Sequence, residues 1–312
     1  MTLLVKEASA REHSTSLRPS KRKARTRAGI IAWLFVVPAI LLASAFKFIP
    51  LFDSFIYSFQ KVQPFLGNTF VGFDNYIAVL VDEKFQSAAL HTVQIATFQT
   101  TGSVLLGLVL ALLLEGQSRR LWFIRTAVFL PVVAAVAVVA EAWRALLYPN
   151  ELGFVNSLLA LFGIQAQPFL TSPDTAIWTI IMIGIWSAGP YNMVIFIAGL
   201  TSIEREMYEA ASLDGANRLQ RLRYIVLPAL RPAFTIVLTL AAIRALRVFT
   251  EVYVLTGGGP AGSTEVWMTR MYTVGTVGNN IGQSAAASII LLVSIIALTG
   301  IVHYFTRRNR DA

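Results

Sequence analysis

Charged side chains inside an apolar stretch are the residues of this sequence best placed to do chemistry. Arg244, Arg247 and Glu251 fall at positions i, i+3 and i+7 of such a stretch. In a helix this spacing would put them on one face, where Arg247 and Glu251 could form an ion pair. The guanidinium of Arg244 could instead hydrogen-bond sugar hydroxyls or a phosphate beside a solvated cavity. Glu141 is a further charged residue of this kind, and it could pair with Arg144 or face the interior.

Aromatic side chains beside a predicted helix break are a second group of candidates. The stretch IWSAGPYNMV (185–194) contains Gly189 and Pro190, which we expect to interrupt a helix and free backbone groups beside a cavity. Tyr191 and Trp186 could stack on a sugar ring there. Both residue types are also common in packing and at membrane interfaces, so the residues alone leave the two roles open.

Enzyme chemistry finds little support in the sequence. There is no cysteine, and the three histidines (His13, His91 and His303) have no paired spacing, so thiolate chemistry and a metal site are not expected. The glycine-rich stretch GGGPAG (257–262) lacks the lysine of the phosphate-binding pattern G-x-x-x-x-G-K-[ST]. We therefore predict no catalytic residue, no metal and no cofactor bound by this chain.

The composition places these residues in a membrane. Of 312 residues 55% are hydrophobic and 14% charged, and the mean hydropathy is +0.63, which a soluble domain could not accommodate. A membrane span needs about 20 mostly apolar residues. We predict an all-α fold, a polytopic transmembrane helical bundle with six spans at about 29–52, 91–114, 126–147, 175–200, 233–256 and 283–306.

The basic residues indicate the orientation. The loops and tails on one side hold 19 of the 26 lysines and arginines, whereas the alternate loops hold 3. Positive charge favours the cytoplasmic side, so both termini are predicted there. The net charge of +9 is then explained by topology, and no nucleic-acid partner is expected. Residues 1–28 are predicted to be a disordered basic tail with weak contact to membrane lipid, 29–306 the transmembrane domain, and 307–312 a short cytoplasmic tail.

The longest basic loop, 201–232, has a recognisable local pattern. Residues 203–213 are predicted to form a short helix that ends at Gly215, which can adopt a left-handed conformation. Asn217 could cap a second short helix over 218–224. Pro228 and Pro232 stand where the next span begins, in a first turn that tolerates proline. A rigid helix–turn–helix and an amphipathic loop at the lipid interface are both compatible with these features.

This loop resembles the EAA loop of ABC-importer permeases. In that loop EAA is followed by three residues, a glycine, nine residues and Ile-x-Leu-Pro. The matching positions, with Asp214 just before the glycine, are Glu209, Ala210, Ala211, Gly215, Ile225, Leu227 and Pro228. The stretches VGFDNYIAVL (71–80), RTAVFLPVV (125–133) and VFTEVYVLTGGGP (248–260) resemble the carbohydrate-uptake subfamily, which includes maltose and glycerol-3-phosphate permeases.

The resemblance implies a type I importer fold in a bacterial cytoplasmic (inner) membrane. It implies that 201–232 contains a coupling helix that docks on a separate ATPase subunit. The expected partners are a second homologous permease, two ABC ATPases that use ATP and Mg, and an extracytoplasmic solute-binding protein. Tyr191 matches a tyrosine of the sugar site in maltose permeases. The family's polar positions in the fifth span are not matched, since Arg244, Ala245 and Val248 occupy them, so maltose itself is not implied.

Two alternatives stay open at this point. The chain could be a permease of the same type for another small solute. It could also be a self-sufficient secondary transporter, for which Glu141 and Glu251 would be a sparse set of ion-coupling residues.

Overall fold

The computed structural model describes residues 33–63 and 66–308; the expected basic tail at 1–28 and the last residues of the C-terminal tail lie outside this part. The chain divides into two units, 1–56 and 57–312. The described residues of the first unit all belong to one apolar helix of 25 residues, Trp33–Tyr57, which is long enough to cross a membrane and whose last residue begins the second unit. It contains a π-helical turn, η1 (Ser44–Phe48), and continues as α2 (Ile49–Tyr57).

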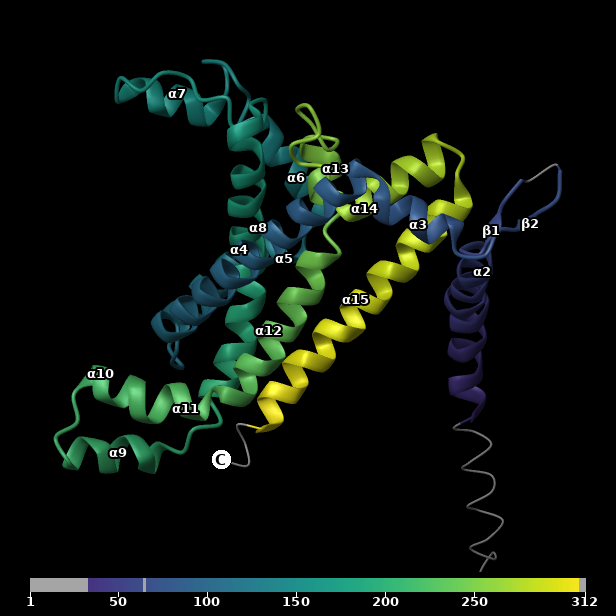
Figure 1. The fold of residues 1–312 in the computed structure, drawn as a ribbon. Coiled ribbons are helices and arrows are strands. Elements are labelled where there is room, and N and C mark those ends of the chain that lie inside the picture. Colours follow the sequence, from purple (N-terminus) through teal and green to yellow (C-terminus); the bar gives the residue numbers. More distant parts are fainter. Residues whose placement is uncertain (1–32, 64–65, 309–312) are drawn as a thin grey trace, which may run out of the picture. The chain divides into compact units, whose positions relative to one another are not determined.

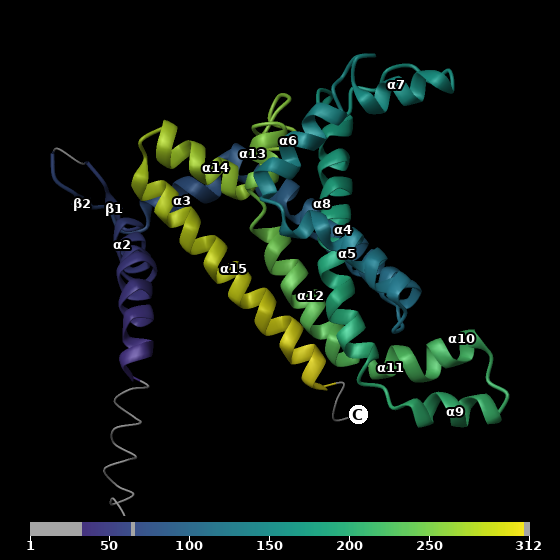
Figure 2. The ribbon, with the colours of Figure 1, turned by 180° about the vertical axis from the view of Figure 1, so that it is seen from behind.

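The second unit consists almost entirely of helices (Figures 1 and 2). It begins with a short antiparallel ribbon, β1 (Gln60–Lys61) and β2 (Thr69–Phe70), in which Gln60 lies opposite Phe70. The helices follow in this order: α3 (Asp74–Val81), α4 (Glu83–Leu113), α5 (Arg119–Val133), α6 (Val136–Leu146), α7 (Phe154–Leu161), α8 (Pro173–Leu200), α9 (Arg205–Leu213), α10 (Arg218–Arg221), η2 (Leu222–Val226), α11 (Leu227–Ala229), α12 (Arg231–Leu246), α13 (Thr250–Leu255), α14 (Trp267–Tyr272), η3 (Thr273–Val277) and α15 (Ile281–Arg308).

Six uninterrupted spans are not what the described residues form. Four helices are long and apolar enough to cross a membrane by themselves: 33–57, α4, α8 and α15 up to Tyr304. Two further spans are possible if each bent pair of helices counts as one span. These pairs are α5 with α6, bent by 98°, and 218–229 with α12, bent by 67°. The expected third span, 126–147, is therefore bent. Pro131 lies in the last turn of α5. The two residues that follow the helix, Ala134 and Ala135, are extended.

The expected fifth span, 233–256, is also broken. Helix α12 ends at Leu246, and α13 begins at Thr250 after the non-helical residues 247–249. The prediction that Arg244, Arg247 and Glu251 share one helical face is wrong for this reason. Arg244 belongs to α12 and Glu251 to α13.

The expected interruption at Gly189-Pro190 is absent, since α8 continues from Pro173 to Leu200. Pro190 removes one backbone donor, but it is buried by neighbouring helices that hold α8 together. A Cβ at Gly189 would lie 2.6 Å from Leu106 Cδ2 of α4. The glycine therefore serves close helix packing here and does not break the helix.

Helices α4 and α8 form the centre of the second unit because small residues let them approach closely. Gly107 of α4 lies against Asn192, and Gly184 of α8 lies against Gln99. Asn192 also donates a buried hydrogen bond of 3.2 Å to Ser103 Oγ. Helix α4 contributes to three apolar clusters, which it shares with α8 and α13, with α8 and α12, and with α14 and α15.

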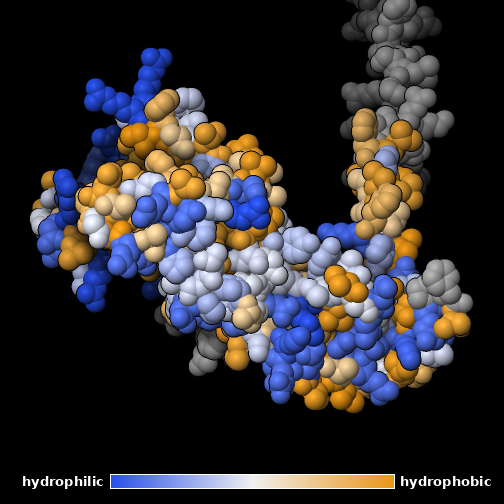
Figure 3. Space-filling view, turned by 90° about the horizontal axis from the view of Figure 1, so that it is seen from above, coloured by the Kyte–Doolittle hydropathy of each residue, from blue (hydrophilic) through white to orange (hydrophobic). Residues whose placement is uncertain are grey.

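The two ends of the second unit differ. Helices α9 and α10 lie at one end, and α7, α13 and α14 lie at the other (Figure 1). Viewed from the α13 end, hydrophilic residues are spread among hydrophobic ones (Figure 3).

Candidate functional site

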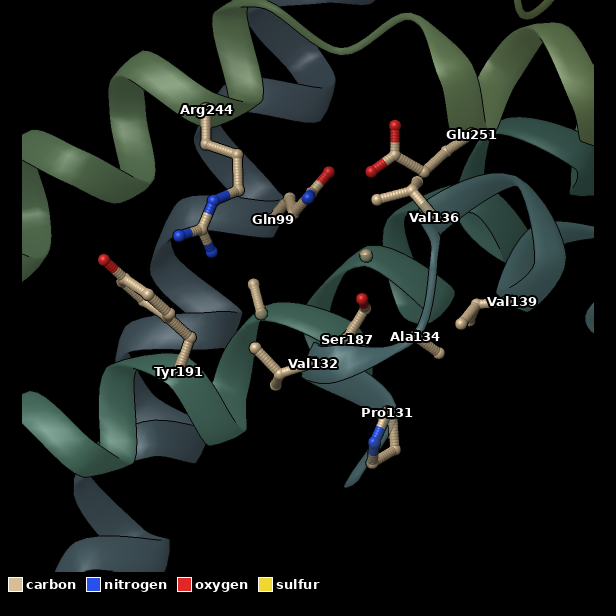
Figure 4. Close-up of a pocket in the computed structure, with 12 residues that line it drawn as sticks. Gln99, Pro131, Val132, Ala134, Val136, Val139, Ser187, Tyr191, Arg244 and Glu251 are labelled. Atoms are coloured by element: carbon tan, nitrogen blue, oxygen red, sulfur yellow. The ribbon is translucent and has the colours of Figure 1, made fainter. Parts of the chain in front are cut away.

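A cavity of about 280 Å³ lies where the bent and broken helices meet α4 and α8 (Figure 4). The end of α5, the break after it and the start of α6 supply one wall, and α4, α8, α12 and α13 supply the rest. Its lining residues are Gln99, Pro131, Val132, Ala134, Val136, Val139, Gly184, Ser187, Ala188, Tyr191, Arg244 and Glu251. The two departures from straight helices are thus what opens this space.

Two of the lining residues are in direct contact with each other. The Arg244 guanidinium carbon lies 4.4 Å from the centroid of the Tyr191 ring. A cation over an aromatic face is stabilised by about 0.5–2 kcal/mol, more when water is excluded. Figure 4 shows the guanidinium pointing toward that ring and the Glu251 carboxylate on the far side of the cavity. Tyr191, Arg244 and Glu251, all expected from the sequence, are therefore brought together.

Gln99 is a lining residue that the sequence reasoning missed. It is 6% exposed, and its Oε1 has no hydrogen-bond partner among the described residues. A Cβ at Gly184 would lie 2.4 Å from Gln99 Cδ, so the glycine is what leaves room for the amide. The sequence does contain a signal for this residue, since an amide in the middle of an apolar span is costly unless it has a partner.

Arg247 and Trp186 are not part of this site. Arg247 is exposed at the end of α12, and the expected ion pair with Glu251 does not form in the described part of the chain. Trp186 packs edge-on against Trp143 at a centroid distance of 5.3 Å and does not line the cavity. The alternatives for Glu141 are resolved by its 2.6 Å contact with Arg144.

The polar helix pair α9–α10 confirms the local predictions for 201–232. Gly215 follows α9 with φ +73°, and Asn217 and Gln220 form reciprocal hydrogen bonds at the start of α10. Pro228 and Pro232 occupy the first turns of α11 and α12. The second helix turns π-helical after Arg221, which is earlier than expected.

The EAA positions lie mostly on the surface of this pair. Glu209, Ala210, Asp214, Gly215 and Pro228 are exposed, whereas Ala211, Ile225 and Leu227 are half-buried. The carboxylate of Glu209 is held by Arg205 at 3.0 Å.

Apolar side chains are exposed beside the EAA positions. Leu213 of α9 is 89% exposed, Leu219 of α10 72% and Tyr224 of η2 70%. Such side chains favour contact with another surface.

Tyr208 ties α9 to the rest of the unit. Its side chain packs against the cluster formed by α4, α8 and α12. Burial and the nearby Glu115 raise the pKa of the Tyr208 hydroxyl above its ordinary value. A displacement of α9 would therefore also displace side chains packed against the central helices.

Helices long enough to cross a membrane, a cavity with charged and polar groups among them and a polar helix pair at one end are features expected of a membrane permease. Residues 97–311 match the family of binding-protein-dependent transport system inner membrane components. The chain belongs to this family of ABC transporter permeases, which confirms the resemblance seen in the sequence.

The relatives span nearly the whole chain. It is 30% identical over 290 residues to the trehalose/maltose transport system permease protein MalF of Thermococcus litoralis, covering 93% of this chain and 98% of that protein. It is 34% identical over 282 residues to the sn-glycerol-3-phosphate transport system permease protein UgpA of Agrobacterium fabrum, covering 90% and 96%. A chain of a bacterial ABC transporter involved in alginate import has the same fold, with a TM-score of 0.80, 24% identity, and 91% and 98% coverage.

Proposed function

We propose that this chain is a membrane-spanning subunit of an ATP-driven importer for a sugar or a glycerophospho-compound. The named transport systems of its relatives, for trehalose/maltose and for sn-glycerol-3-phosphate, support this range of substrates. A cavity containing Arg244, Gln99, Ser187 and Tyr191 offers hydrogen-bond donors and an aromatic face to such a solute.

The partners follow from the family. We propose a second homologous permease subunit, two ABC ATPases that consume ATP and Mg, and an extracytoplasmic solute-binding protein. The alginate transporter was also solved with an alginate-bound periplasmic protein, which supports a binding protein as partner. The lysine and arginine distribution supports a location in the bacterial cytoplasmic membrane with both termini in the cytoplasm.

The single observation that carries the coupling role is the α9–Gly215–α10 pair. The EAA residues of this pair are Glu209, Ala210, Ala211, Asp214 and Gly215. Ile225, Leu227 and Pro228 complete the motif in η2 and α11. Exposed apolar side chains on this pair offer a surface for an ATPase, and Tyr208 links that surface to the central helices. Closure of the ATPases on ATP would then shift the permease between two states, and hydrolysis would return it.

A pair of substitutions at Gly215 tests this role. Its Cβ position is open space, so only the positive φ opposes a side chain there. Valine is strained at that φ, whereas asparagine tolerates it. In proteoliposomes with the complete complex, Gly215→Val should retain ATP hydrolysis and lose most solute uptake, while Gly215→Asn should keep both. Normal uptake by Gly215→Val, or uptake that needs no ATP, would contradict the proposal.

A further inference from the structure

We propose that Glu251 is a specificity-determining residue that makes the cavity reject anionic solutes. This inference rests on the proposed import function, and it concerns which of the two substrate types the cavity favours. The argument starts from the charges in the cavity wall.

The cavity wall carries one cation and one anion that do not neutralise each other by contact. Arg244 is engaged by the Tyr191 ring, which covers a face of the guanidinium without removing its charge. Glu251 lies in the first turn of α13, half-buried, and forms no ion pair within the described residues. No other ionisable group with a full charge is among the twelve residues that line this cavity.

The size of the cavity determines what these charges do to a solute. The cavity is small, about 280 Å³, and the Arg244 guanidinium and the Glu251 carboxylate lie on two sides of it (Figure 4), so an anionic group inside it is subject to both charges. Repulsion from the carboxylate then opposes attraction to the guanidinium, and the two balance for a group that lies midway between them. A phosphate or carboxylate would also lose hydration on entry, without a net gain from the wall.

A neutral, hydroxylated solute meets a different balance. Gln99 supplies an amide whose oxygen has no hydrogen-bond partner in the described part of the chain, and Ser187 supplies a hydroxyl (Figure 4). Arg244 donates and Glu251 accepts, so hydroxyl groups can satisfy both charged residues at once. Glu251 therefore turns what would be an anion site around Arg244 into a site for neutral polyols.

The absence of cysteine from the chain makes this testable by site-directed labelling. A Ser187→Cys variant places one thiol in the cavity wall, and Val136→Cys gives a second reporter in the wall. The assembled complex is treated with methanethiosulfonate reagents carrying a sulfonate or a neutral hydroxyethyl group. The rate of modification of this chain is followed by intact mass, and the sulfonate-to-neutral rate ratio reports how the cavity treats an anion.

Adding Glu251→Gln should raise that ratio by about fivefold or more, since a unit charge within the cavity width is removed. Arg244→Gln should lower it. Glu141→Gln is the matched control, because Glu141 is on the neighbouring helix, pairs with Arg144 and does not line the cavity; it should leave the ratio within about twofold.

Equal ratios for Glu251→Gln and Glu141→Gln would overturn the proposal. It would also be overturned if neither thiol reacted with the neutral reagent, because selection requires that solutes enter. Labelling uses no ATP, so a failure here leaves the import function standing. Loss of ATP-driven uptake, conversely, would contradict the import function without altering the labelling ratios.

Discussion

Arg270 donates a hydrogen bond of 2.8 Å to the carboxylate of Asp82, 188 positions earlier in the chain. Asp82 also accepts a bond from the backbone N–H of Lys84 and so caps α4. Burial opposes ionisation of this carboxyl, but its bonds from Arg270, Lys84 and Phe85 outweigh that effect and hold its pKa below the ordinary value. One side chain thereby starts the central helix and fastens it to α14.

We predict that this pair stabilises the protein above about pH 4 and loses its effect in acid. Since the folded pKa is lowered, the stabilisation is complete above the unfolded value of about 3.9 and is lost as pH falls through the folded value. Asp82→Asn should keep the cap and lose about 1–3 kcal/mol of unfolding free energy at neutral pH. Thermal unfolding across pH measures this. Asp74→Asn is the control, and equal behaviour of the two variants would argue against the pair.

Gly184 is predicted to be required because of Gln99. Gly184→Ala should destabilise the protein by about 1–3 kcal/mol, since the new methyl group meets the amide at 2.4 Å. Gln99→Ala should relieve most of that cost in the double variant. Gly107→Ala is the control. Its new methyl group would lie 3.0 Å from the backbone of Gly189 and 2.6 Å from Asn192 Cβ, and not against Gln99, so Gln99→Ala should not restore its stability. Thermal unfolding of the single and double variants measures this. If the double variant is no more stable than Gly184→Ala alone, the contact with Gln99 is not the cause of the loss.

Tyr191 is predicted to hold Arg244 in place through its ring and not through its hydroxyl. Tyr191→Leu should weaken the apparent affinity of uptake by about 2- to 30-fold, the range that corresponds to 0.5–2 kcal/mol. Tyr191→Phe keeps the ring and should stay near the parent value. The KM for uptake by the reconstituted complex measures both. The hypothesis fails if the leucine and phenylalanine variants are alike.

Asn217 is predicted to stabilise the start of α10. Asn217→Ala removes the reciprocal bonds with Gln220 and should cost about 1 kcal/mol locally, which corresponds to about fivefold faster amide hydrogen exchange over 218–226. Asn217→Asp preserves the cap and should exchange like the parent. Unchanged exchange in the alanine variant would mean that packing, and not the cap, orders this helix.

The polar helix pair could be predicted from the sequence because the residues that end and cap its helices act on their near neighbours in the chain. Gly215 adopts a positive φ and Asn217 caps within three residues, whatever the rest of the chain does. The charged and aromatic candidates Arg244, Glu251 and Tyr191 were also identifiable, since such residues are costly in an apolar span.

The bends and the continuous α8 could not be predicted because they depend on neighbours. Pro131 lies in the last turn of a helix that ends two residues later, whereas Pro190 is enclosed by α8's neighbours and leaves the helix unbroken. No local pattern distinguishes the two prolines. The membership of Gln99 in the cavity likewise depends on Gly184 of another helix. Arg247 and Trp186 do not line the cavity. Arg247 lies in the non-helical stretch 247–249, and Trp186 packs against Trp143.

The break between α12 and α13 makes the electric field inside the cavity a function of conformation. Arg244 and Glu251 lie on opposite sides of the non-helical residues 247–249, so any rotation of α13 relative to α12 there would change the separation of the two charges. Their influence on a solute varies with that separation. Helix orientation and solute affinity are then thermodynamically linked: a force that stabilises one orientation also sets how tightly the solute is held. An unbroken helix would fix this separation, and affinity would have to change by other means.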